Sequence, residues 1–337
     1  MARFHFRKAI AFLIVVFAQP TFSEETVNII TWWDYIDPDI VQSVETQCNA
    51  KVSIDEYYSD PEFLRRIDGQ QYDIAIYSDT VYGKFTKSVQ SSQKDLQSEF
   101  VPQYLESVQE NFQLGHYRSD TVYYQLSITG LLWNPRLILL SKDDTVEAVF
   151  EKAKGKTVVM LDEHVEVLYL LSKKNVSGEA DLSSISGVSN LFNGVNINVT
   201  NALANLTTKD DFAFAFTWSG EAIEHINSVS PDFRFLVHPT LSHVSKDLLT
   251  LISDSDIAEC VARNLSSKEH LNRLTQTYFY FSPYENDSEN TAAYNVMNVS
   301  FKDSIDKLES LARITPAQYE ILDIEWQKLK MTFGIAP

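Results

Sequence analysis

The sequence contains only two cysteines and only one long hydrophobic run among its 337 residues. That run, Ala9–Ala18, is about half as long as the ~20 apolar residues that cross a bilayer, and no second run follows it. A membrane-spanning protein is therefore not expected. Internal repeats and low-complexity stretches are also missing, so a chain of this length and composition indicates two globular domains.

Three motifs that mark common enzyme classes are absent as well. The chain has no GxSxG turn, no glycine-rich phosphate loop and no HExxH helix. One catalytic alternative stays open, because Glu163 and Glu166 could act as the acid and base of a periplasmic enzyme. Carboxylates so close in sequence more often belong to a binding site or to the surface, so we expect no catalysis.

The first 23 residues have the features of a cleaved secretory signal. Arg3, Arg7 and Lys8 precede the apolar run without any acidic residue, and Thr21 and Ser23 are small residues suited to a signal peptidase. We expect cleavage after Ser23. No cysteine lies near this junction, so a lipid-anchored form is not expected, and the mature chain is predicted to be in a periplasm or outside the cell.

Acidic residues greatly outnumber basic ones. The chain has 46 Asp and Glu against 28 Lys and Arg, a formal net charge of -18 that becomes -21 when the three basic residues of the signal are removed. This balance disfavours nucleic acid as a partner and gives cationic ligands a favourable long-range field. Most of these carboxylates are expected to be solvated surface groups.

Short apolar strands alternate with helices along most of the chain. Strands are predicted at 27–31, 51–54, 73–77, 157–161, 212–217, 233–237 and 248–252. Helices are predicted at 39–48, from an N-cap at Asp60 to about Gly69, and from a cap at Ser267 to Thr277. This alternation is typical of α/β folds with largely parallel sheets, in which binding residues lie in turns at the carboxyl ends of strands.

The two cysteines allow one disulfide bridge, and bridges persist in exported proteins. However, Cys260 shares an apolar helix face with Ile257, Val261 and Leu265, where a buried free thiol fits equally well. Both interpretations of Cys48 and Cys260 remain open.

Aromatic and acidic residues recur in the turns that follow the predicted strands. These turns contain Trp32 to Tyr35, Ser78 to Thr80, Asp162 to Glu166, Trp218 to Gly220 and Tyr280 to Pro283. Aromatic rings cover methylene groups and attract cations by their faces, and carboxylates accept ammonium protons. The pattern therefore favours a small alkylammonium ligand.

A metal site is a weaker alternative in the same region. Its ligands would be Asp162, Glu163, His164 and Glu166, with His238 and His243 further along the chain. Their spacing matches no strong zinc signature, so solvated polar residues are the better interpretation.

Five segments occur in a fixed order: NIITWWDYIDP at 28–38, YDIAIYS at 72–78, KGKTVVMLDEHVE at 154–166, FTWSGEA at 216–222 and YFSP at 280–283. This ordered set resembles the periplasmic spermidine/putrescine-binding proteins of ABC transporters, of which the chain would be a divergent member. The resemblance implies a type II solute-binding fold. Such a fold has two α/β lobes, each a mixed, mostly parallel sheet flanked by helices, with a hinged cleft between them.

Position by position, the resemblance implies a ligand site made of Trp32, Tyr35, Ser78, Glu163, Glu166, Trp218, Asp247 and Tyr280. The chain also departs from the family. Thr80 and Ser245 stand where the family has aromatic residues, and no counterpart of its late glutamine is found near Arg313.

The resemblance further implies that residues 26–125 and 246–290 form lobe 1 and that residues 126–245 and 291–337 form lobe 2. We expect a monomer that captures a small cation, a polyamine, in the cleft without a cofactor or metal. The partner would be an inner-membrane ABC permease. Docking of the ligand-loaded form on a membrane sensor protein is the alternative that the sequence leaves open.

Overall fold

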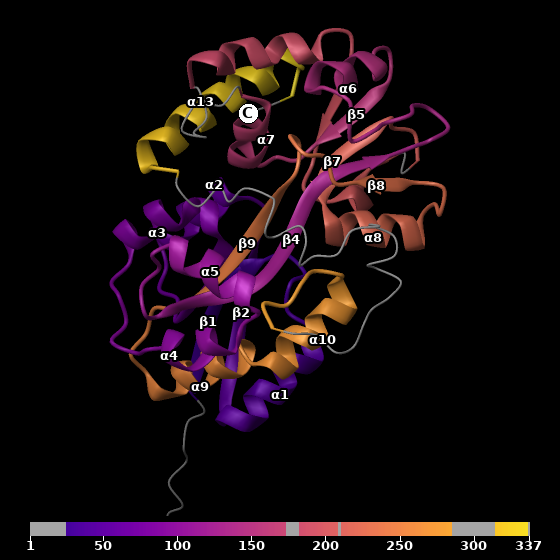
Figure 1. Ribbon diagram of the computed structural model, residues 1–337. Helices are drawn as coiled ribbons and strands as arrows, with labels where there is room; N and C mark the ends of the chain where they lie inside the picture. Colours follow the sequence, from indigo (N-terminus) through magenta and orange to yellow (C-terminus); the bar gives the residue numbers. More distant parts are fainter. Residues whose placement is uncertain (1–24, 173–181, 208–209, 285–313, 336–337) are drawn as a thin grey trace, which may run out of the picture.

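One sheet runs through the part of the molecule that the computed structural model describes, residues 25–172, 182–207, 210–284 and 314–335. Its order is β2-β1-β3-β9-β4-β7-β5-β6, and β8 pairs with β4. The predicted signal, residues 1–23, lies outside the described residues, as does residue range 285–313, which contains the predicted return from lobe 1 to lobe 2. Figure 1 shows helices flanking the sheet in a lower and an upper half.

The lower half contains three parallel strands: β1 (Glu25–Trp32), β2 (Ala50–Tyr57) and β3 (Ile74–Ser78). Apolar side chains such as Val27, Ile29 and Ile74 are fully buried, because helices cover these strands. The helices of this half are α1 (Pro38–Cys48), α2 (Asp60–Ile67), α3 (Tyr82–Ser88), α4 (Gln97–Phe100), α5 (Glu106–Leu114), α9 (Asp256–Leu265) and α10 (Lys268–Tyr278).

The upper half repeats this arrangement. Strand β5 (Thr157–Met160) lies between β6 (Asn196–Val199) and β7 (Phe214–Trp218), parallel to both. Helices α6 (Val146–Lys152), α7 (His164–Leu171), α8 (Ser219–Ser228) and α13 (Pro316–Thr332) belong to this half, and α13 packs against α7. Helix α8 follows β7 directly and α7 follows β5 after three residues, so their first turns lie near the carboxyl ends of these strands.

Two long antiparallel strands join the halves: β4 (Thr121–Trp133) and β9 (His243–Leu251). Strand β9 also pairs with β3, placing Asp247 opposite Ser78, and β4 also pairs with β7, placing Thr129 opposite Trp218. The short strand β8 (Arg234–Leu236) pairs with the end of β4. This is the predicted α/β fold of two lobes, and the predicted lobe boundaries at 125 and 246 fall within the two connecting strands.

Every predicted strand and helix is present, but some differ in extent, and two strands, β4 and β6, were not predicted. Strand β4 was not among the predicted strands, because all 13 of its residues are buried and it lacks the alternation of a half-exposed strand. Strand β9 begins at His243, five residues before the predicted start, for the same reason. The N-cap of α2 is Ser59 instead of Asp60, since the Ser59 side chain accepts a hydrogen bond from the Glu62 amide.

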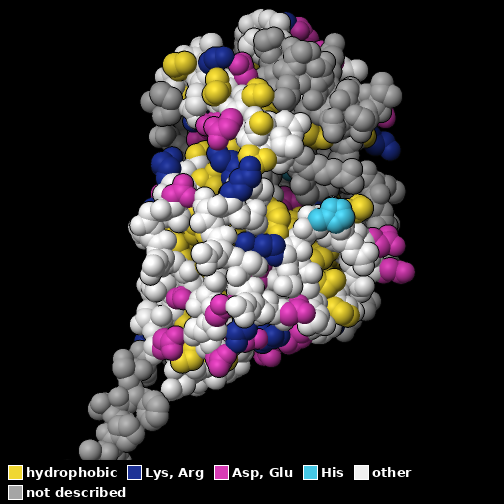
Figure 2. Space-filling model, turned by 90° about the vertical axis from the view of Figure 1, so that its left-hand side faces the viewer, with side chains coloured by type: hydrophobic (Ala, Val, Ile, Leu, Met, Phe, Trp, Pro, Cys, Tyr) yellow, Lys and Arg dark blue, Asp and Glu magenta, His cyan; other side chains and the backbone are white. Residues whose placement is uncertain are grey.

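No helix in the described ranges has both the length and the apolar character that crossing a membrane requires. Figure 2 shows Asp and Glu side chains scattered over one face among Lys and Arg. They form no single acidic patch on the described part of that face, which agrees with the expectation of solvated surface carboxylates.

A disulfide bridge links Cys48 at the end of α1 to Cys260 in α9, and the free-thiol interpretation of these cysteines is wrong. The two cysteines are 212 residues apart, so the bridge ties the N-terminal strand-helix unit to the segment that follows β9.

Replacing both cysteines by serine is expected to lower the free energy of unfolding by about 2–4 kcal/mol, because the bridge restricts a long loop of the unfolded chain. Urea unfolding monitored by circular dichroism measures the change. Reduced wild-type protein should unfold at the same urea concentration as the variant. An unchanged midpoint in both would contradict the prediction.

Candidate ligand-binding site

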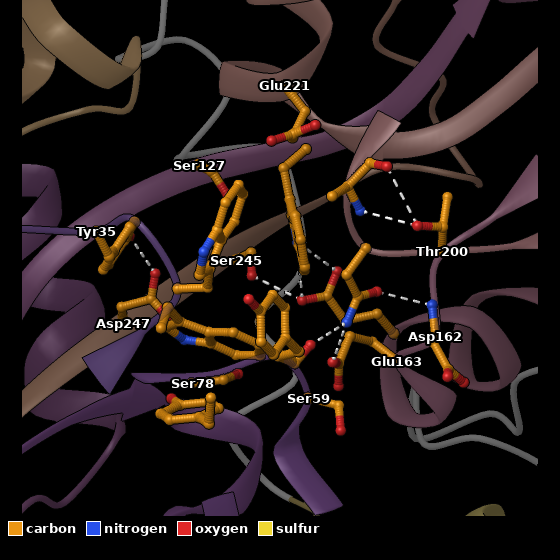
Figure 3. Close-up of a pocket in the computed structure, with 18 of the residues that line it drawn as sticks. Tyr35, Ser59, Ser78, Ser127, Asp162, Glu163, Thr200, Glu221, Ser245 and Asp247 are labelled. Carbon is orange, nitrogen blue, oxygen red and sulfur yellow. Dashed lines mark hydrogen bonds between the residues drawn. The ribbon is translucent and has the colours of Figure 1, made fainter. Parts of the chain in front are cut away.

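A cavity of about 340 Å³ lies between the two halves, and all eight predicted site residues line it. Figure 3 shows aromatic rings in the middle of this cavity, with Glu221 above them, Asp247 to the left beside Tyr35 and Glu163 to the right. The structure therefore brings together side chains from turns up to 248 positions apart in the chain, from Trp32 to Tyr280. Further lining residues include Trp33, Tyr57, Tyr58, Ser59, Ser127, Asp162, Thr200, Asn201, Asn205, Glu221 and Ser245.

The lower half contributes an aromatic wall around one carboxylate. Trp32 is the last residue of β1, and Tyr35 follows it in the next turn. The Tyr35 hydroxyl donates a hydrogen bond of 2.5 Å to Asp247 Oδ2, and the rings of Tyr35 and Tyr280 lie 5.6 Å apart, edge to face. Asp247 is thus held in β9 with its carboxylate against the rings.

The upper half contributes two glutamates from equivalent positions. Glu166 is the third residue of α7, and Glu221 is the third residue of α8. Both helices begin within a few residues of the ends of neighbouring strands, and both side chains line the cavity from the first helical turn. Glu163, the N-cap residue of α7, is the third glutamate of this wall.

Aromatic rings from the two halves meet across the cavity. The ring centroids of Trp32 and Trp218 are 6.1 Å apart, and Trp32 also contacts Tyr57 at 4.5 Å. At the mouth, the exposed Trp33 and Tyr58 are stacked at 5.7 Å. The cavity walls therefore present several ring faces to a ligand.

A direct polar contact also crosses the mouth. Asn201, which follows β6, donates a hydrogen bond of 2.9 Å to the Tyr58 carbonyl in the lower half. The same amide donates to Glu163 Oε1 at 2.7 Å. Contact between the halves is thereby coupled to a carboxylate of the cavity.

Glu166 is already saturated with protein donors. Its oxygens accept hydrogen bonds from Ser245 Oγ (2.8 Å), Thr129 Oγ1 (2.9 Å) and Trp218 Nε1 (3.1 Å), and His243 Nε2 lies 3.3 Å away. Burial acts to raise the pKa of Glu166, but the charge and hydrogen bond of His243 and the two hydroxyl donors outweigh it, so the pKa lies below its usual value.

Asp247, Glu221 and Glu163 are in the opposite situation. Burial raises the pKa of Asp247 to about 7 despite the Tyr35 hydrogen bond, and it raises the pKa of Glu221 to about 7 despite a hydrogen bond from the Leu203 amide. Burial, with the nearby Asp60 and Glu166 charges, also holds the pKa of Glu163 well above its usual value. Among the described residues, none of these three carboxyls has an ion pair with Lys, Arg or His.

Other acids near the cavity do have basic partners. Asp162 Oδ1 lies 3.0 Å from Lys330 Nζ and accepts from Trp326 Nε1 at 2.8 Å, and the Asp79 carboxylate lies 3.2 Å from Lys246 Nζ. The three carboxyls without such partners are therefore the ones at which an incoming positive charge gains most.

Two of the further lining residues take part in the contacts or carboxyl groups described above but were not predicted from the sequence. Glu221 belongs to the FTWSGEA segment, from which only Trp218 was selected, although Glu221 is the third residue of α8 as Glu166 is of α7. Asn201 gave no comparable signal, because it follows a short strand that the sequence pattern did not predict.

In the described ranges, no group of three or more His, Cys, Asp or Glu side chains has an arrangement that could hold a metal ion. His164, one of the residues considered as a metal ligand, is instead buried against the ring of Tyr319, at 4.4 Å between centroids.

Comparison with solved structures identifies the fold. A substrate-binding protein of a spermidine/putrescine ABC transporter from Streptococcus pneumoniae matches 92% of this chain and all of its own, with a TM-score of 0.69 and 17% identity. The chain has the fold of the spermidine/putrescine-binding proteins. A protein from Listeria monocytogenes named for a spermidine/putrescine ABC transporter matches with the same coverage, a TM-score of 0.72 and 18% identity.

This type II solute-binding fold also holds other ligands. A binding protein from A. tumefaciens solved with glucopine covers 90% of this chain and 99% of its own, with a TM-score of 0.64 and 12% identity. No protein-family model and no curated protein sequence matches the chain. The comparisons thus confirm the fold predicted from the ordered segments, and the ligand has to be argued from the cavity itself.

Proposed function

We propose that the chain is a periplasmic solute-binding protein that captures a small organic cation with two or more ammonium groups, a polyamine. The observation that carries this proposal is the set of three cavity carboxyls, Glu163, Glu221 and Asp247, that have no basic partner among the described residues and face aromatic walls.

An ammonium group suits these carboxyls better than a neutral ligand does. A carboxylate buried without a partner is costly, which is why these groups have raised pKa values. An ammonium donates charge-assisted hydrogen bonds and removes that cost, while the methylene chain between two ammonium groups packs against the rings of Trp32, Trp218 and Tyr280. The neighbours named for spermidine and putrescine support the same ligand class.

Glu163 and Glu166 are better interpreted as part of a binding site than as a catalytic acid and base. Glu166 is occupied by four protein donors, so it lacks the freedom of a general acid or base, and the similar structures are solute-binding proteins. The eight predicted residues are accordingly proposed to form a binding site, in which Glu163, Asp247 and the added Glu221 are the acids that contact the ligand.

The contacts between the halves support capture by closure. Trp32 and Trp218 meet across the cavity, and Asn201 bonds to the Tyr58 carbonyl on the other side. We propose that residues 26–125 with 246–290 and residues 126–245 with 291–337 move as two lobes, and that ligand between them favours this closed arrangement. An inner-membrane ABC permease that engages the closed form would then receive ligand-loaded protein.

Calorimetry of the mature protein with putrescine, spermidine, amino acids, sugars and divalent metals tests this function. We expect one polyamine per chain to bind and the tryptophan fluorescence to change, because Trp32 and Trp218 line the cavity. Small-angle scattering should show a smaller radius of gyration on saturation. If another ligand class gives binding heat and polyamines give none at millimolar concentration, the assignment of a polyamine ligand is wrong. Ligand binding with unchanged dimensions would contradict the closure.

A further inference from the structure

The side chain of Asn201 joins three parts of the molecule. Its Oδ1 accepts a hydrogen bond of 2.8 Å from the Asp162 amide, and because a backbone N–H can only donate, this bond fixes which end of the side-chain amide is the oxygen. The NH2 group at the other end donates to Glu163 Oε1 at 2.7 Å and to the Tyr58 carbonyl at 2.9 Å. One amide is therefore shared between a cavity acid of the upper half and the backbone of the lower half.

The turn that contains Asn201 is held by its own half. The Thr200 amide donates to the Met160 carbonyl at the end of β5, at 2.9 Å, and Thr200 Oγ1 accepts from the Ala202 amide at 3.1 Å. The Asp162 amide adds its bond to Asn201 itself. The bond from Asn201 to the lower half is therefore the one that breaks when the two halves separate.

The acceptor in the lower half depends on Asn201. Tyr58 lies between β2 and α2, and its own amide donates to Glu62 Oε2 at 2.8 Å, which anchors it to α2. Among the described residues, Asn201 is the one donor to the Tyr58 carbonyl. Opening of the cleft exchanges this bond for hydrogen bonds to water, and closure forms it again.

The acid at the other end of the amide keeps one oxygen for a ligand. Glu163 lines the cavity and uses Oε1 for Asn201, while its Oε2 accepts no hydrogen bond from the described residues. Burial, with the nearby Asp60 and Glu166 charges, holds the pKa of Glu163 well above its usual value, so the empty cavity favours the neutral acid. An ammonium at Oε2 ionises Glu163, and a hydrogen bond to an ionised acceptor is about twice as strong as a neutral one. A bound cation thus strengthens the bond from Asn201 to Glu163 and holds the amide in the orientation that donates to Tyr58.

We propose that Asn201 is a positioning residue that couples capture of the ligand at Glu163 to contact between the two halves. This role rests on the proposed function, both for the class of ligand and for closure. Because coupling between two sites is reciprocal, the bond to Tyr58 also favours the ligand at Glu163. Asn201 thereby slows the escape of a captured cation, although it does not bind the charge of the cation itself.

Stopped-flow tryptophan fluorescence with putrescine measures the dissociation rate and the association rate separately. In Asn201→Ala the dissociation rate should rise about tenfold, because the loaded form loses two hydrogen bonds, one of them to an ionised acid. The association rate should stay within about twofold of wild type, since the bond to Tyr58 forms only after the ligand has entered the open cleft. In a Glu163→Gln background the same substitution should raise the dissociation rate about threefold or less, because the charge that strengthens the bond is gone.

Asn201→Asp tests the NH2 group by itself. The variant keeps an oxygen for the Asp162 amide, but it directs a second oxygen at the Tyr58 carbonyl and at Glu163. Added negative charge alone favours a cation, whereas the proposed role requires weaker binding, so putrescine should dissociate about tenfold faster than from wild type. Asn198→Ala and Asn198→Asp are the matched controls, since Asn198 is an exposed residue of β6 that does not line the cavity. Both controls should leave the two rates unchanged.

The outcomes separate this role from the proposed function. If wild-type protein binds putrescine and Asn201→Ala leaves the dissociation rate unchanged, the role is wrong and the proposed function stands. The same conclusion follows if the effects of Asn201→Ala and Glu163→Gln on that rate are independent, or if Asn201→Asp binds putrescine as tightly as Asn198→Asp does. A wild-type protein that binds no polyamine contradicts the proposed function, and this role of Asn201 with it.

Discussion

Asp247→Asn is expected to weaken polyamine binding by roughly tenfold to a hundredfold, the loss of one hydrogen bond to a charged group, about 1.5–3 kcal/mol. The asparagine keeps a carbonyl oxygen that can accept the Tyr35 hydroxyl, so the aromatic wall should be retained. What is lost is the negative charge. Calorimetry with putrescine measures the change in the dissociation constant.

The ligand-free variant should also be at least as stable as wild type at pH 8, because it no longer buries an uncompensated carboxylate there. Asp143→Asn is the control: it removes the same charge from an exposed position and should leave affinity unchanged. Equal affinity of Asp247→Asn and wild type would mean that Asp247 does not contact the ligand cation.

The location of the candidate site was predictable because it depends on local patterns. Parallel strands place their carboxyl ends at one edge, so the polar and aromatic residues after 27–31, 73–77, 157–161 and 212–217 could be expected to converge. The turns at Trp32, Ser78, Glu163 and Trp218 do line one cavity. The period of the apolar residues predicts where each strand ends, and the turn residues then indicate which side chains lie at that end.

What each carboxylate does in the cavity was not predictable from such patterns. Glu163 and Glu166 look equivalent in the sequence, yet Glu166 meets donors from β4, β7 and β9, which lie up to 79 positions away. Strand register decides which donors reach it, since Thr129 lies opposite both Trp218 and His243. That register runs through β4, whose fully buried sequence gave no alternation from which to predict a strand.

The disulfide shows the same limit on a smaller scale. An apolar helix face at Ile257, Val261 and Leu265 correctly indicated packing, but it could not show that α1 is the helix packed beside it. Only the contact between α1 and α9 brings Cys48 next to Cys260.

Polyamine affinity is expected to fall about a hundredfold when the pH is lowered from 8 to 6. Asp247 and Glu221 have pKa values raised by burial to about 7 in the ligand-free protein. Below pH 7 each carries a proton that an ammonium must displace, which costs about tenfold in affinity per group over this range. The ligand's amines keep their charge throughout, because alkylammonium groups titrate near pH 10.

The stability of the ligand-free protein should change in the opposite direction. A carboxyl with a raised folded-state pKa stabilises the fold at low pH, and this contribution is lost as the pH rises from about 4 through 7. The melting temperature without ligand should therefore decline between pH 5 and pH 8, while the increase in melting temperature caused by saturating ligand should grow.

Proton release on binding gives a direct test of the same two carboxyls. Calorimetry at pH 6 in two buffers of different ionisation enthalpy should detect the release of between one and two protons per ligand, and at pH 8 it should detect about none. A pH-independent affinity without proton release would show that these two carboxyls do not contact the ligand, and Glu221 would then be only a wall of the cavity.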